Sequence, residues 1–154
     1  MISVQIDESA LQQLQQRLAG LAPRVVAQVY EALQPLIYQS LRTAVPKYFA
    51  GAASKGSPGD LLTSRSGDLM NSVLQSIETK IDGQSLTVRI GSELPYARIH
   101  EYGGFAGRPG PFKKKEGRRP YIRPRPYLQP AINDLQRALP ALLEQAIQQV
   151  QVSE

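Results

Sequence analysis

Hydrophobic positions near the start of the chain change from one spacing to another. Residues 2–6 alternate Ile, Val and Ile with Ser and Gln, which is typical of a short strand with one buried face. Leucines then recur every three or four residues over 11–21, so a helix follows. Ser9 and Gln12 have the spacing of a capping box at its start, and Gly20 is placed to end it.

The helical spacing returns twice more. Pro23 is placed at the first turn of a helix whose hydrophobic positions continue to about Tyr48. A proline inside a helix removes a hydrogen bond, so Pro35 predicts a kink or a division into two helices. Residues 128–149 predict a strongly amphipathic final helix that Pro140 could bend.

A hairpin is the clearest predicted element. Two alternating runs, 73–81 and 84–91, flank an Asp-Gly pair at 82–83 that suits a two-residue type I′ turn. Closing the turn on this pair places Ile77 opposite Val88 and gathers the hydrophobic residues on one side.

Glycine and proline interrupt the remaining segments. Residues 50–62 and 103–120 are expected to be flexible loops, the second of them long and basic. Residues 121–126 must be extended, because each residue before a proline is pushed out of the helical region. This segment could form an edge strand.

Two short helices are expected between these segments, one over 66–72 with Ser66 as its cap and one over 94–102. Together the elements predict an α+β fold. A small, mainly antiparallel sheet would carry the N-terminal and C-terminal helices on one face. At 154 residues the chain is expected to form a single domain, residues 1–154.

The residue inventory contains little that could perform catalysis. The chain has no cysteine and one histidine, so a thiolate or two-histidine metal site is excluded. We expect His100 to be a ring held by a hydrogen bond at a turn or interface. We also expect no cofactor, no metal site, no enzymatic activity, no secretory signal and no membrane segment.

Positive charge is concentrated in one segment. Residues 98–125 contain nine of the 18 basic residues but only two of the 13 acidic ones. Such a segment could dock onto an acidic protein surface, contact the phosphates of DNA, or be a solvated loop without a partner. The candidate contacts to DNA or to an acidic partner are Arg108, Lys113, Lys114, Lys115, Arg118 and Arg119.

Three short motifs occur in order along residues 60–135. They are Arg65-Ser66-Gly67-x-Leu69-x-x-Ser72, Pro95-Tyr96-Ala97-x-x-His100-Glu101-x-Gly103 and Arg125-Pro126-Tyr127-Leu128-x-Pro130-Ala131. With the hairpin between the first two, this order resembles the tail-completion family of long-tailed bacteriophages. That grouping includes the Mu-like virion morphogenesis proteins and the lambda-type minor tail proteins. The chain departs from many relatives in its long basic insert between Gly103 and Tyr121.

The resemblance implies a structural protein without enzymatic activity, located in the virion at the phage neck after assembly in the host cytoplasm. Its subunits would form a ring, with a hexamer favoured, between the head-closure or connector proteins and the tail-terminator or tail-tube proteins. The ring would lie close to the packaged double-stranded DNA. The alternative is a DNA-binding accessory module that uses residues 108–125.

Rigid tyrosines and a proline-stiffened arm suit a subunit interface, and such an arm could lie along the sheet edge of a neighbour. Tyr127 and Leu128 could equally fill the core of this chain. The candidate interface residues are Tyr96, His100, Glu101, Tyr102, Gly103, Arg123, Pro124, Arg125, Pro126 and Tyr127.

Overall fold

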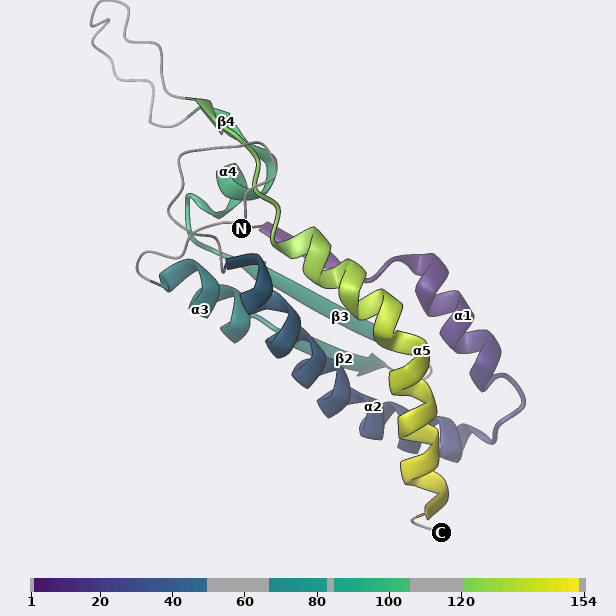
Figure 1. The fold of residues 1–154 in the computed structure, drawn as a ribbon. Coiled ribbons are helices and arrows are strands. Elements are labelled where there is room, and N and C mark those ends of the chain that lie inside the picture. Colours follow the sequence, from purple (N-terminus) through teal and green to yellow (C-terminus); the bar gives the residue numbers. More distant parts are fainter. Residues whose placement is uncertain (1, 50–66, 83–84, 106–120, 153–154) are drawn as a thin grey trace, which may run out of the picture.

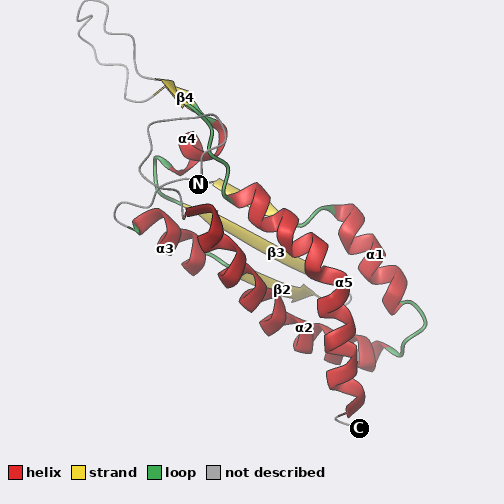
Figure 2. Ribbon diagram, viewed as in Figure 1, coloured by secondary structure: helices red, strands yellow, loops and turns green. Residues whose placement is uncertain are grey.

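The computed structural model describes residues 2–49, 67–82, 85–105 and 121–152. In chain order the elements are β1 (Ile2–Gln5), α1 (Glu8–Leu18), α2 (Pro23–Ala44), the 3₁₀ helix η1 (Val45–Phe49), α3 (Asp68–Gln75), β2 (Glu78–Asp82), β3 (Ser85–Ser92), α4 (Ala97–Tyr102), β4 (Gly104–Phe105), β5 (Tyr121–Ile122) and α5 (Leu128–Val152). The α+β class is confirmed (Figure 2). The predicted loop over 50–62 lies outside the described residues.

One three-stranded antiparallel sheet organises the body. Its strand order is β1-β3-β2, so the N-terminal strand pairs with the second strand of the hairpin. Helices α2 and α5 lie side by side across one face of this sheet, and α1 lies beside α5 (Figure 1). The predicted placement of the terminal helices on one face is therefore confirmed.

The core lies between the sheet and helices α2 and α5. Strand β3 contributes Leu86, Val88 and Ile90, all nearly inaccessible to solvent. Both long helices bury residues at helical spacing, because one apolar stripe on each faces the sheet. The fully buried residues on these helices include Val29, Leu33, Ile37, Leu41, Ala131, Ile132 and Leu135.

The two prolines inside long helices do not divide them. Helix α2 continues through Pro35 from Pro23 to Ala44, so the alternative of two helices was wrong. Pro35 and Glu31 are both exposed on α2, and Pro140 is exposed on α5. On the solvent side, water can satisfy the carbonyl that a proline leaves without its helical partner.

The hairpin forms, but its predicted register was wrong. Asp82 pairs with Ser85 and Ile81 with Leu86, so the loop residues are 83–84. Val88 consequently faces Thr79 where Ile77 had been expected. The displacement is two residues along one strand, which leaves every side chain on its predicted face because the side-chain period is two. The structure thereby places Ile81 against Leu86, which a turn at 82–83 would not do.

Two predicted helix caps also differ from the structure. Asp7, not Ser9, is the residue before α1, and the Ser9 hydroxyl donates to Asp7 Oδ2 at 2.6 Å instead of capping the helix. Helix α3 begins after Gly67, whose φ of 78° is left-handed, and extends through Gln75, further than predicted. Ser66 lies outside the described residues.

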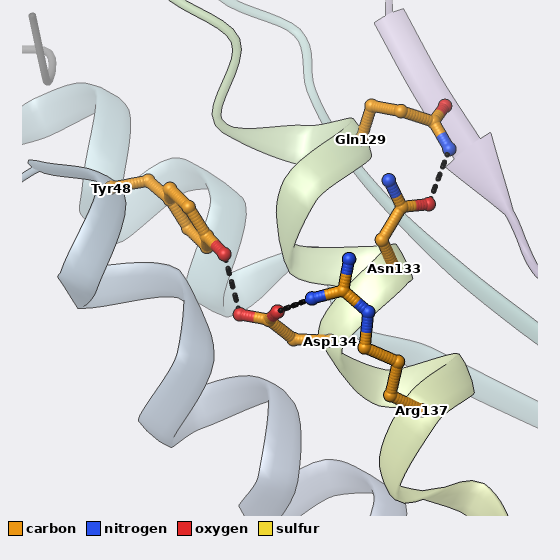
Figure 3. A network of polar contacts seen from close by, with 5 residues as sticks. All are labelled: Tyr48, Gln129, Asn133, Asp134 and Arg137. Atoms are coloured by element: carbon orange, nitrogen blue, oxygen red, sulfur yellow. Dashed lines mark hydrogen bonds and ion pairs between the residues drawn. The ribbon is translucent and has the colours of Figure 1, made fainter.

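A polar cluster ties η1 to the last helix. The Tyr48 hydroxyl donates to Asp134 Oδ2 at 2.5 Å, and Arg137 Nη1 lies 3.6 Å from Asp134 Oδ1 (Figure 3). This hydrogen bond, with burial as the second cause, raises the pKa of Tyr48. One turn earlier on α5, Gln129 Nε2 donates to Asn133 Oδ1 at 3.1 Å. The cluster fixes the segment after α2 against the start of α5.

Candidate interface on the arm formed by α4, β4 and β5

A short arm extends from one end of the body. We define it as residues 96–105 and 121–126, which contain α4, β4 and β5. Strands β4 and β5 pair antiparallel, with Gly104 opposite Ile122 and Phe105 opposite Tyr121. The predicted edge strand at 121–126 is thus real but only two residues long. Figure 1 shows this ribbon pointing away from the sheet and the long helices.

The base of the arm is joined to the body by Glu101. Its carboxylate accepts hydrogen bonds from three successive backbone N–H groups at the start of α5, those of Tyr127 (2.7 Å), Leu128 (2.9 Å) and Gln129 (3.0 Å). A carboxylate at this position satisfies donors that a helix start leaves unpaired and also complements the helix dipole. Glu101 is only 3% exposed. The structure therefore places this predicted interface residue inside the subunit.

Tyr127 is likewise part of the core. Its hydroxyl donates to the carbonyl of Ala97 at 3.0 Å, and its ring packs against Phe49 with centroids 5.1 Å apart. Burial, followed by the neighbouring Glu101 carboxylate, raises the pKa of Tyr127. Tyr127 and Leu128 are both fully buried. Of the two interpretations that the sequence left open for them, the structure supports the core.

Gly103 permits the turn and the proline-rich segment to lie against each other. Its φ of 75° is left-handed, and a Cβ added there would lie 2.8 Å from Pro124 Cδ and 3.0 Å from the carbonyl oxygen of Ile122. The N–H of Arg125 donates to the His100 carbonyl at 2.7 Å. The close backbone approach that a glycine allows at this position thus occurs within the chain.

His100 is held by packing. Its ring lies edge-on to Tyr96 with centroids 5.9 Å apart. The expected hydrogen bond to the ring is missing at Nδ1, which is buried without a partner among the described residues. Burial and the nearby Arg125 guanidinium lower the pKa of His100, so the neutral imidazole is favoured. No cluster of three metal-ligating side chains occurs in the part of the chain that the structure describes.

Exposed aromatic side chains are concentrated on the arm. Of the six large hydrophobic residues exposed in the described ranges, four belong to it: Tyr96 (40%), Tyr102 (60%), Phe105 (64%) and Tyr121 (55%). The rings of Phe105 and Tyr121 form an edge-to-face pair with centroids 5.3 Å apart. Exposed apolar groups gathered in this way are typical of a binding surface.

Tyr96 and Tyr102 were among the predicted interface residues, whereas Phe105 and Tyr121 were not. The signal for the second pair was an aromatic residue before Arg108 and another after Arg119, which only strand pairing brings together. Arg123 and Pro126 are exposed on the arm, as is Pro124. The six basic residues from Arg108 to Arg119 lie outside the described residues.

Within the described ranges, no helix is sufficiently long and apolar to cross a bilayer.

Comparison with known proteins identifies the family. An uncharacterized protein of Methanocaldococcus jannaschii is 32% identical over 73 residues, which are 47% of this chain and 44% of that protein. The match thus spans less than half of either chain. No solved structure matches. Residues 8–146, which include strands β2 and β3, the arm and most of α5, match the phage virion morphogenesis family, and the chain belongs to this family.

Proposed function

We propose that this chain, which its family makes a structural protein of the phage virion, is a tail-completion subunit. It would form a ring at the head-tail junction and join the head connector to the tail. The observation that carries the proposal is the arm, where Phe105 and Tyr121 form an exposed aromatic pair at one end of the molecule. A subunit that must grip neighbours needs such a surface outside its own core.

The arm is suited to this role because its base is fixed to the body and its aromatic pair is exposed. The Glu101 carboxylate and the buried Tyr127 fix the base to α5, whereas the two rings at the tip remain in solvent. A preorganised surface loses little conformational entropy when it binds. Adhesion through the arm requires no reactive group, which agrees with a structural role and no catalysis.

Replacing both rings, Phe105→Ser with Tyr121→Ser, is expected to prevent joining in the phage that encodes this chain. Aromatic anchors each contribute about 2 kcal/mol, so losing two lowers affinity by roughly 1,000-fold. Full heads and complete tails should then accumulate unjoined, as counted by electron microscopy. Tyr38→Ser is the matched control, because Tyr38 is likewise an exposed aromatic residue (40%) but lies on α2. Fully joined particles from the double variant, or location of the chain away from the neck, would contradict the proposal.

A salt titration separates this proposal from a DNA-binding module that uses residues 108–125. A docking subunit should bind duplex DNA weakly at moderate salt. A phosphate binder that neutralises about six charges should instead lose roughly 1,000-fold in affinity between 50 and 200 mM salt. Fluorescence anisotropy with a labelled duplex measures both cases. Tight binding with that steep dependence would favour the DNA-binding module.

A further inference from the structure

The sheet face that points away from α2 and α5 is polar and open to solvent. Along each strand, the side chains on this face alternate with those that point to the core, such as the buried residues of β3. The exposed residues on this face are Ser3, Gln5, Glu78, Lys80, Thr87 and Arg89.

A cleft of about 380 Å³ lies at one end of this open face, between α3, β1 and β3. Polar groups that line the cleft already form hydrogen bonds with one another. The N–H of Gly91 donates to Ser76 Oγ at 2.8 Å, and the hydroxyls of Ser72 and Ser92 are 2.9 Å apart. Two exposed carboxylates, Glu78 and Glu93, and one exposed guanidinium, Arg89, line it, and neither carboxylate forms an ion pair with a described residue. The cleft therefore offers a partner an excess of one negative charge.

The arm offers the complementary charge. Arg98 and Arg123 are exposed and form no ion pair with a described residue. The acidic residue of the arm, Glu101, is already engaged with the start of α5. Guanidinium and carboxylate groups form charge-assisted and often bidentate hydrogen bonds, so the arm of one molecule suits the cleft of another.

Both surfaces lie at the same end of the molecule. The cleft includes Ser92 and Glu93, and α4 begins at Ala97, a few residues further along the chain. For copies arranged about an axis that runs along the length of the body, two such surfaces would lie at the same height. A contact between different surfaces of neighbouring copies can then close into a ring.

We propose that the cleft receives the arm of a second copy, with Glu78 and Glu93 of one subunit paired with Arg98 and Arg123 of the next. This contact rests on the proposed function and deepens it, because it names the surfaces through which the ring closes.

Charge reversal tests the contact. The full-length protein should self-associate with increasing concentration in sedimentation velocity at low salt. Arg123→Glu alone and Glu93→Arg alone should each weaken association by about 10-fold or more, because each places like charges together. Mixing these two variants should restore association, since every contact in an alternating assembly again joins opposite charges.

Matched controls come from the exposed part of α2. Arg24→Glu and Glu31→Arg reverse the same charges outside the cleft and the arm, and should leave association unchanged. A wild type that stays monomeric at every concentration would overturn the inference, and so would reversals that have no effect or that the mixture fails to rescue. If loss of the arm rings still blocked joining in that case, only this contact would be wrong and the proposed function would stand.

Discussion

Glu101→Ala is expected to lower the free energy of unfolding by about 3 kcal/mol, which is a large part of the stability of a domain of this size. The substitution removes the acceptor for three backbone N–H groups, two of them in buried hydrogen bonds. Donors left unsatisfied away from water account for most of this loss. Urea denaturation followed by circular dichroism measures it.

Glu101→Gln and Glu93→Ala complete this experiment. The glutamine keeps one acceptor oxygen but loses the charge that complements the helix start, so about half of the loss is expected to remain. Glu93 is exposed, and Glu93→Ala should change stability by less than about 0.5 kcal/mol. If Glu101→Ala proved as mild as Glu93→Ala, the carboxylate would not support the start of α5 as described.

Tyr127→Ala is expected to destabilise the protein by about 4 kcal/mol, in the range of large aromatic deletions from a core. The cavity would open beside Phe49, and the carbonyl of Ala97 would lose its donor. Tyr127→Phe separates the two causes, since it keeps the ring and should cost only about 1 kcal/mol for the hydrogen bond. Thermal unfolding by calorimetry would measure both.

Tyr102→Ala is the control for Tyr127→Ala, because Tyr102 lies on the arm and is 60% exposed. Its loss should leave the unfolding transition nearly unchanged. Equal destabilisation by the alanine substitutions at 102 and 127 would contradict the division between an exposed arm surface and a buried base.

Periodicity was sufficient to predict the body of the fold. Alternation over residues 2–6 and helical spacing on either side of Pro35 reflect burial on one face, which is a property of each segment alone. Two effects compete for the hairpin register. The Asp-Gly pair favours a turn at 82–83, whereas a turn one residue further along pairs Ile81 with Leu86. Local turn preference was outweighed by pairing across the strands.

The site was harder to predict because its key contacts join distant segments. The motif around Glu101 drew attention to the correct residue, but nothing near it in sequence indicates that its carboxylate caps a helix 26 residues later. Similarly, Phe105 and Tyr121 belong to one surface only because β4 and β5 pair. Core and interface residues have similar compositions, so the assignment of Tyr127 needed its neighbours in space.

The hydrogen bonds at the base of the arm separate the arm from the body of the fold. Glu101 and the N–H of Arg125 form them where the chain leaves the body and where it returns. A change in the number of residues between Phe105 and Tyr121 should therefore not disturb the packing of α2 against α5. Variants of this chain with a longer insert or a different insert charge are therefore expected to keep the packing of the hydrophobic core unchanged.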